Sequence, residues 1–301
     1  MNGLHDNLIS AENFLMQWNP TGERDEQLSR FSSRYSEWIS KFPSTIQIVL
    51  IELLTIFNYY THGAVVASLK ELHALLVEKH GVDHENALYT YIKTDSGKIN
   101  SSIDYWLDYR RMYNIDKGFC KDDLDSFPMD QWKYVENIVI IDDCCCSGSS
   151  LEKFLNKSQK DYCGKAIFYI VVCSMRDAKF KIDELEKTHG VKIYLLSCFA
   201  QEKAFDLERI ERLCDRLCFR DYSVSLGISP NYALGKYESE SLMAFYNNIP
   251  NNTLGILWCS IGGNANIFER HFSKRTPWQM KAEKDRRQKA NYHSAKQRES
   301  V

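Results

Sequence analysis

No segment of the 301-residue sequence holds about 18 uninterrupted apolar residues, the length that a membrane-spanning helix needs. The longest apolar stretch, "TIQIVLIELLTIFNYY", is broken by Gln47 and Glu52. The segment from Met1 to Pro20 also lacks a basic cluster followed by a long apolar core, which is the pattern of a secretion signal. We therefore expect a cytoplasmic protein without a membrane partner.

The sequence has little net charge, −2, but that charge is unevenly distributed. From Arg270 to Val301 ten Lys and Arg stand against three Asp and Glu, so the rest of the chain is acidic. A basic run of this kind is usually a solvated or disordered end. The alternative for the basic tail, residues 279–301, is electrostatic contact with nucleic acid or with an acidic partner.

Cysteine is present ten times, but not in the pattern of a disulfide framework or a zinc site. The cysteines are scattered, three are adjacent at positions 144–146, and no Cys-x-x-Cys pair lies near these three. We therefore expect reduced thiols, as in the cytosol. A cysteine in a phosphate-binding loop with a lowered pKa, and hence sensitive to oxidation, is a further interpretation.

The first 80 residues have the periodicity of helices. Apolar residues recur at helical spacing from Phe31 to Phe42, before Pro43. A second helix is predicted with Ser44 as its cap and apolar residues from Ile46 to Tyr60, and a third is predicted after Gly63. We assign residues 1–24 to a lead segment and residues 25–85 to an N-terminal helical layer.

Strand and helix patterns alternate from about Asn86 onward. The segments "ALYTYI", "IVII", "KAIFYIVVCSM" and "VKIYLLSCFA" are apolar and typical of buried strands. Charged helical stretches lie between them, which predicts a parallel α/β domain over residues 86–278. A further strand is predicted from Thr253 to Cys259 in a C-terminal extension. Ligands of such sheets bind at the carboxyl ends of the strands.

The segment "NIVIIDDCCCSGSS" places polar chemistry at such an end. Asp142 and Asp143 follow the apolar run, and the turn at residues 147–150 leads into a helix. Two common nucleotide motifs do not match it: a Walker A loop requires a Lys that is missing, and a dinucleotide fingerprint requires three glycines where only Gly148 is present.

A phosphate site fits this segment better. The backbone N–H groups at the start of a helix favour a bound phosphate, Ser hydroxyls add donors, and Gly148 permits close approach. Asp142 and Asp143 would repel a phosphate but suit the hydroxyls of a sugar or a Mg²⁺ ion. A ribose 5-phosphate unit suits the whole segment, with its phosphate in the Ser/Gly turn and its 2- and 3-hydroxyls at the two acids. The plainer alternative is that the two carboxylates only cap the following turn.

This segment resembles the phosphoribosyl pyrophosphate (PRPP) signature of the type I phosphoribosyltransferases, with Ser147 and Ser150 at the usual Thr positions. The resemblance implies a type I phosphoribosyltransferase-like core that binds PRPP together with Mg²⁺, which arrives with PRPP and is not held by the protein alone. It implies catalytic roles for Asp142 and Asp143. The implied phosphate-binding residues are Cys144, Cys145, Cys146, Ser147, Gly148, Ser149 and Ser150.

The loop "TDSGKINSS" precedes this segment in the chain. The family binds pyrophosphate with a short loop after an earlier strand, and this loop supplies N–H, hydroxyl and ammonium donors. The alternative is an ordinary turn followed by a solvated helix face. The candidate pyrophosphate-binding residues are Ser96, Gly97, Lys98, Ser101, Ser102, Arg110 and Arg111.

A wider resemblance covers roughly residues 25–275. The segments "LLTIFNYYTHGAV", "YWLDYRRMYNI" and "IPNNTLGILWCSIGGNANIFER", together with the PRPP-like signature, resemble the PRTase-CE group of phosphoribosyltransferase-like proteins from bacterial conflict systems. The implied role is anti-phage defence beside a partner effector or a retron reverse transcriptase.

Two functions remain open at this point. The first is a phosphoribosyltransferase, whose catalysis would be chiefly positioning and electrostatics. The second is a non-catalytic sensor of PRPP or a nucleotide, or a scaffold, because neither an acceptor-base pocket nor a flexible catalytic loop is recognisable. A phosphatase would need an Asp-x-Asp pattern, which Asp142 and Asp143 do not provide.

Overall fold

The computed structural model describes residues 10–92, 102–121, 124–158, 160–261 and 266–268. The chain divides into two compact units, Met1–Glu269 and Arg270–Val301, and every described residue belongs to the first. No helix in these described ranges combines the length and the apolar composition that crossing a bilayer requires. The basic tail lies outside the described residues, and the division of the chain into four segments stays a prediction.

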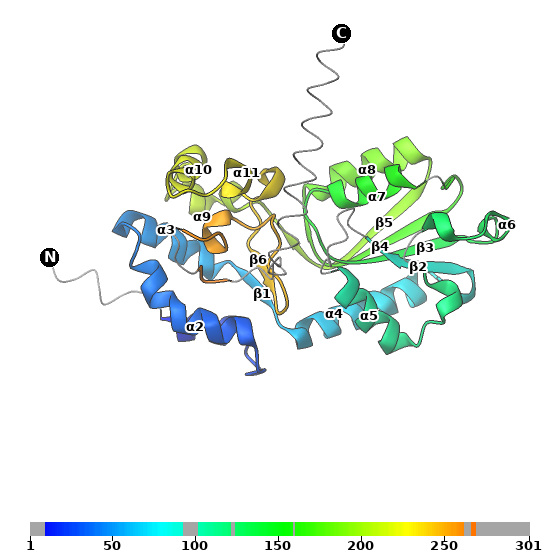
Figure 1. Ribbon diagram of the computed structural model, residues 1–301, viewed down its shortest axis with the longest axis horizontal. Coiled ribbons are helices and arrows are strands. Elements are labelled where there is room, and N and C mark those ends of the chain that lie inside the picture. The colour runs from blue at the N-terminus through cyan, green and yellow to red at the C-terminus, as the bar shows by residue number, and fades with distance from the viewer. Residues whose placement is uncertain (1–9, 93–101, 122–123, 159, 262–265, 269–301) are drawn as a thin grey trace, which may run out of the picture. The chain divides into compact units, whose positions relative to one another are not determined.

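Four parallel strands form the central sheet in the order β2-β3-β4-β5 (Figure 1). Two shorter strands, β1 and β6, pair in parallel in a second sheet. The predicted parallel α/β core is therefore confirmed. The strands are β1 (Asn58–Tyr60), β2 (Ala87–Tyr91), β3 (Asn137–Cys145), β4 (Ala166–Met175), β5 (Lys192–Gln201) and β6 (Met243–Phe245).

Helices cover both faces of the four-stranded sheet (Figure 1). One apolar core contains Leu69 of α4 and Tyr109 of α5, and the core on the opposite face contains Leu155 of α7 and Ile182 of α8. The run at residues 138–141 contributes alternately to both cores, which explains why it is apolar without interruption. The helices of these layers are α4 (His62–Ala74), α5 (Ser102–Tyr113), α6 (Met129–Trp132), α7 (Ser149–Lys157) and α8 (Ala178–His189).

The N-terminal helices form a third apolar core with segments from the last third of the described chain. Its centre is aromatic: the rings of Trp18 and Phe31 lie 4.9 Å apart, and those of Phe57 and Phe268 stack at 5.0 Å. The prediction of helices before residue 56 is confirmed. The helices around this core are α1 (Ala11–Trp18), α2 (Glu26–Ile39), α3 (Ser44–Thr55), α9 (Glu208–Glu211), α10 (Arg216–Ser225) and α11 (Pro230–Ala233).

The predicted second helix is too long, and its cap is misplaced. Helix α3 begins at Ser44 itself, which makes no side-chain cap, and ends at Thr55. The chain then forms β1, because Asn58–Tyr60 finds hydrogen-bonding partners on Met243–Phe245. That pairing joins segments about 185 residues apart in the sequence, so local periodicity does not reveal it.

The predicted strand from Thr253 to Cys259 is wrong. Thr253 makes only an isolated bridge to Ser241, and Gly255–Leu257 forms a 3₁₀ turn. The backbone of Gly255 lies so close to the carbonyl oxygen of Tyr232 that an added Cβ would be 2.5 Å from it. The apolar residues of this segment fill the N-terminal core without extending a sheet.

Candidate functional site

The two predicted catalytic carboxylates lie in the last part of β3. The strand continues through Asp142 and Asp143 to Cys145, and Asp142 is in register with Val171 of β4. Because the strands of the sheet are parallel, the ends of β2, β4 and β5 lie at the same edge. This is the edge at which open α/β sheets bind their ligands.

Asp142 is held by hydroxyl groups and has 5 % of its surface exposed. Ser102 donates a hydrogen bond to Oδ1 at 2.5 Å, and Tyr169 donates one to Oδ2 at 2.8 Å. The backbone N–H of Asp143 adds a third at 2.9 Å. Burial, and next the charge of Asp143, raise the pKa of Asp142 to about 8, although the hydrogen bonds from Ser102 and Tyr169 act in the opposite direction. Burial and the neighbouring charge therefore favour the protonated form of this carboxyl group.

Asp143 lies toward the other face of the sheet and is 7 % exposed. Its carboxylate accepts a hydrogen bond from the backbone N–H of Cys144 at 2.7 Å. Burial, and then the charge of Asp143, raise the pKa of Tyr105, whose side chain belongs to the core beneath α4 and α5. Tyr169, the partner of Asp142, belongs to the opposite core. The two adjacent acids therefore have different surroundings, one facing each core of the sheet.

Of the three adjacent cysteines, Cys144 and Cys145 end β3 and Cys146 follows it; Cys145 belongs to one core, and Cys144 and Cys146 to the opposite one. Cys145 and Cys146 are buried, and the thiol of Cys146 donates to Cys144 with 3.7 Å between the sulfur atoms. This hydrogen bond, then burial and the charge of Asp143, raise the pKa of Cys144, and burial raises that of Cys145. Protonated thiols are poor nucleophiles and poor metal ligands. Within the described ranges no group of three His, Cys, Asp or Glu side chains is arranged to hold a metal ion.

The turn after the cysteines brings hydroxyl and N–H donors to the start of α7. Gly148 has a φ of +72°, in the left-handed region that favours glycine, and an added Cβ would be 2.9 Å from Cγ of Lys181. The hydroxyls of Ser147 and Ser149 are 2.8 Å apart. Gly148 has no side chain to cap α7, and the N–H of Ser149 donates to the hydroxyl oxygen of Ser147 at 3.4 Å. The start of a helix, with its N–H groups and its dipole, favours an anion.

The candidate pyrophosphate residues divide into three groups. Ser96, Gly97, Lys98 and Ser101 lie outside the described residues. Ser102 begins α5 and reaches Asp142, so the structure joins these two predicted sites at that contact.

Arg110 and Arg111 lie near the other end of α5, about 12 Å along the helix from Ser102. Arg110 donates to the carbonyl oxygen of Ile115, and Arg111 lies 3.7 Å from the carboxylate of Asp108. Their pyrophosphate role stays a prediction.

Three side chains at the site were not predicted from the sequence. Tyr169 is one residue of an apolar strand pattern, and Tyr105 and Lys181 lie on helices without any motif. A buried tyrosine needs a hydrogen-bond partner for its hydroxyl, and this is the signal in the sequence that points to Tyr169.

The family model of PRTase-CE matches residues 35–278 of the chain. This match confirms the resemblance expected from the signature and the flanking segments. No curated protein matches the chain.

Proposed function

The chain belongs to the PRTase-CE family, which is phosphoribosyltransferase-like, and on this premise we propose that it binds PRPP with Mg²⁺ and transfers or cleaves the ribosyl–phosphate bond. The observation that carries the proposal is one continuous unit: two acids at the carboxyl end of β3, a turn with Gly148 at positive φ, and the uncapped start of α7. The 5-phosphate would lie in the turn and accept hydrogen bonds from its N–H and hydroxyl groups.

The acid pair would serve the ribose. Asp143 is the group in the better position to accept hydrogen bonds from the ribose hydroxyls and to stabilise positive charge at the anomeric carbon, since Asp142 already accepts three hydrogen bonds. In the transfer reaction the bond from that carbon to the pyrophosphate oxygen breaks, both electrons leave with pyrophosphate, and a bond to the acceptor forms. Asp143 offers the hard oxygen donors that Mg²⁺ prefers, and Mg²⁺ bound with PRPP would neutralise the departing phosphates.

A second candidate function is a sensor or scaffold that binds PRPP or a nucleotide without reaction. The burial of both carboxylates favours it, because a catalytic pair must reach the ligand and these two are 5 % and 7 % exposed. In either form we propose a role in bacterial anti-phage defence, beside an effector protein or a retron reverse transcriptase, from the family's setting.

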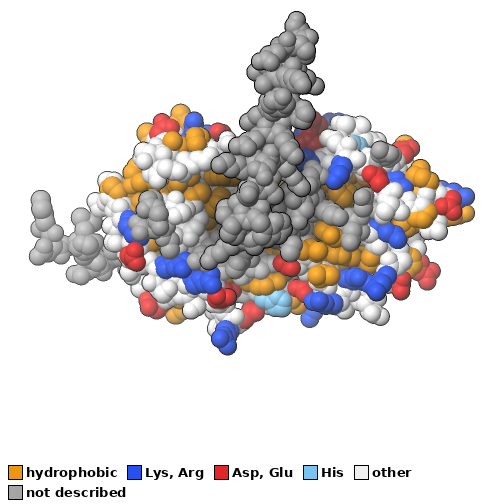
Figure 2. Space-filling view, viewed as in Figure 1, with side chains coloured by type: hydrophobic (Ala, Val, Ile, Leu, Met, Phe, Trp, Pro, Cys, Tyr) orange, Lys and Arg blue, Asp and Glu red, His pale blue; other side chains and the backbone are white. Residues whose placement is uncertain are grey.

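Nucleic acid contact through residues 279–301 also remains a proposal. On the face shown in Figure 2, basic and acidic side chains are interspersed over the described residues. The proposal therefore depends on the charge of the tail. Loss of co-purified nucleic acid from a chain ending at Trp278 would support it.

Calorimetry with PRPP and Mg²⁺ tests the site. Replacing both acids, Asp142→Asn with Asp143→Asn, should abolish binding and leave the fold intact. Of the single variants, Asp143→Asn should lose more affinity than Asp142→Asn. Asp130→Asn, an exposed acid of α6, is the matched control and should bind like the wild type.

Unchanged PRPP binding by the double variant would refute the site assignment. Incubation of the wild type with PRPP and a panel of nitrogen bases separates the two functions. Pyrophosphate release with any base supports the enzyme, whereas PRPP binding without release supports the sensor.

A further inference from the structure

Residues 235–241, here called the arm, have an unusual backbone conformation. Three non-glycine residues of this segment adopt positive φ: Tyr237 at 59°, Glu238 at 52° and Glu240 at 50°. Each such residue costs roughly 1 kcal/mol or more and persists only where its surroundings fix it. The arm is thus held in a conformation that its own residues disfavour.

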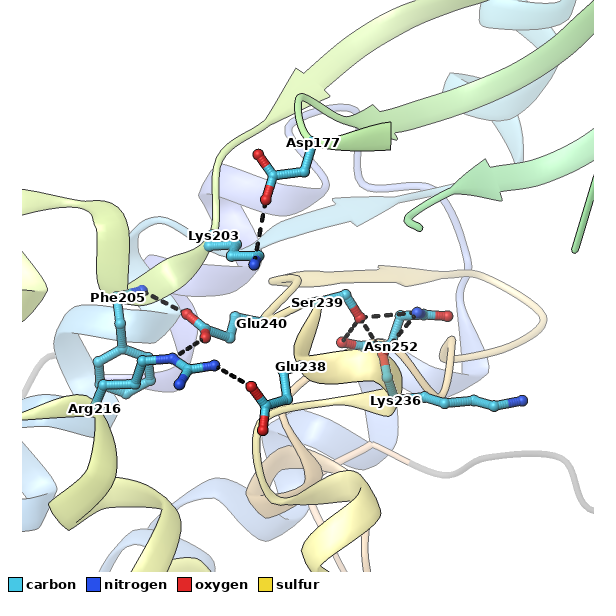
Figure 3. A network of polar contacts seen from close by, with 9 residues as sticks. All are labelled: Asp177, Lys203, Phe205, Arg216, Lys236, Glu238, Ser239, Glu240 and Asn252. Atoms are coloured by element: carbon cyan, nitrogen blue, oxygen red, sulfur yellow. Dashed lines mark hydrogen bonds and ion pairs between the residues drawn. The ribbon is translucent and has the colours of Figure 1, made fainter. Parts of the chain in front are cut away.

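Buried polar contacts hold the arm in place (Figure 3). The side chain of Glu240 is fully buried and accepts hydrogen bonds from the guanidinium of Arg216 and, at 3.2 Å, from the backbone N–H of Phe205. The amide of Asn252 donates to the hydroxyl of Ser239 at 2.8 Å. These bonds come from three different parts of the chain, so the conformation is fixed from several sides.

The arm contacts the helix that begins at the phosphate turn. The ammonium of Lys153 on α7 donates to the hydroxyl of Tyr237 at 3.0 Å. The ammonium groups of Lys153 and Lys236 lie 5.7 and 5.0 Å from the centre of the Tyr237 ring. Lys153 follows Ser150 by three residues, and helical side chains lean toward the N-terminus, so the Lys153 side chain extends toward the first turn of α7. Through Lys153, the arm joins a second ammonium group and a phenol hydroxyl to the helix that starts at residues 147–150.

The phosphate turn itself contains no cation. Residues 144–150 include neither Lys nor Arg, and two acids precede them. Glu152, in the first turn of α7, is bound by Lys181 at 2.7 Å, and Glu238 of the arm is bound by Arg216 at 2.8 Å. A phosphate dianion at this turn would need positive charge from elsewhere in the fold.

We propose that Lys153, Lys236 and Tyr237 complete the phosphate site by binding the outward oxygens of the 5-phosphate. This inference rests on the proposed function and adds to it a second group of phosphate ligands, carried partly by the arm. The oxygen of Tyr237 accepts its hydrogen bond from Lys153, which leaves the phenol hydrogen to donate to the phosphate. The same hydrogen bond, with the charge of Lys236, lowers the pKa of Tyr237, as expected in a cationic setting.

Binding of single-phosphate ligands tests this assignment. Ribose 5-phosphate carries the 5-phosphate, and pyrophosphate with Mg²⁺ does not. Calorimetry with both ligands therefore measures binding at the 5-phosphate site and at the pyrophosphate site separately. The double variant Lys153→Gln with Lys236→Gln should bind ribose 5-phosphate about tenfold or more weakly and should bind pyrophosphate as the wild type does. Tyr237→Phe, which keeps the ring, should weaken ribose 5-phosphate by a smaller factor.

Lys179→Gln is the matched control, since Lys179 is exposed on the neighbouring helix α8, and it should leave both affinities unchanged. Thermal denaturation verifies that each variant is folded. If the double variant is not folded, the single variant Lys153→Gln replaces it. Equal affinity of wild type and variant for ribose 5-phosphate overturns the inference and leaves the proposed function standing. If the wild type binds neither ribose 5-phosphate nor PRPP, the proposed function falls and the inference with it.

Discussion

Asp142 and Glu240 are both buried carboxyl groups, and the protein satisfies them in opposite ways. Asp142, at the phosphate turn, receives hydrogen bonds from two hydroxyls and a backbone N–H. Glu240, in the arm, receives them from the guanidinium of Arg216 and from a backbone N–H. One acid has only neutral donors, and the other has a cation.

Neutral donors offset burial only in part, so the pKa of Asp142 is raised to about 8 by burial and then by the charge of Asp143. In the arm, the guanidinium of Arg216 offsets the burial of the Glu240 carboxylate by a direct contact. The end of β3, just before the phosphate turn, therefore contains an acid whose charge depends on pH. The arm contains an ion pair whose role is to fix a strained backbone.

Of the changes that test this comparison, removal of the Arg216 guanidinium should have the largest effect on the free energy of unfolding. Arg216→Ala leaves Glu240 buried without its cation, and we expect a loss of about 3–5 kcal/mol in the free energy of unfolding. Urea denaturation at pH 7 measures it.

Glu238→Gln is the matched control for this prediction. Glu238 binds the same guanidinium at 2.8 Å, but its side chain is 58 % exposed. Exposed pairs contribute about 1 kcal/mol or less, so this variant should change stability little. Similar losses for Arg216→Ala and Glu238→Gln would contradict the assignment of Glu240 as the essential partner.

The pH dependence of stability tests the other buried acid, Asp142. The pKa of Asp142 is raised in the folded state, to about 8, from about 4 when unfolded. Between these values the folded protein binds a proton that the unfolded chain lacks, so this contribution is complete below pH 4 and falls as pH rises. Relative to Asp142→Asn, the wild type should lose about 1.4 kcal/mol of unfolding free energy for each unit from pH 5 to 7.

Urea denaturation of both proteins at several pH values gives this difference. Asp130→Asn, at an exposed position, should follow the wild type throughout. Parallel curves for the wild type and Asp142→Asn would show that Asp142 is ionised in the folded state at neutral pH.

The phosphate turn was predictable from the sequence because it is contiguous: an apolar run, two acids and a Ser/Gly turn lie within 14 residues. The hydrogen bonds to Asp142 could not be predicted, because Ser102 and Tyr169 approach this residue only when α5 and β4 pack beside β3. The arm carries no motif at all. Its conformation depends on Arg216 and other remote residues, and positive φ at Tyr237 contradicts the local preference of that residue.

The hydroxyl of Tyr169 gives the smallest effect and the finest test of the charge on Asp142. At pH 6 the acid is neutral, and Tyr169→Phe should cost about 1 kcal/mol, the value of a neutral hydrogen bond. Above pH 8 the acid is ionised, the hydrogen bond becomes charge-assisted, and the cost should rise to about 2 kcal/mol. Urea denaturation at pH 6 and 9.5 measures both values.

Tyr35→Phe provides the control for the loss of a buried hydroxyl. The Tyr35 side chain is also buried, but its hydroxyl has no hydrogen-bond partner among the described residues. Its removal should be neutral or slightly stabilising at either pH, because an unsatisfied buried donor is lost. A cost for Tyr169→Phe that is the same at pH 6 and 9.5 would mean that Asp142 does not change its charge between them, and that the two buried acids differ less than their hydrogen bonds indicate.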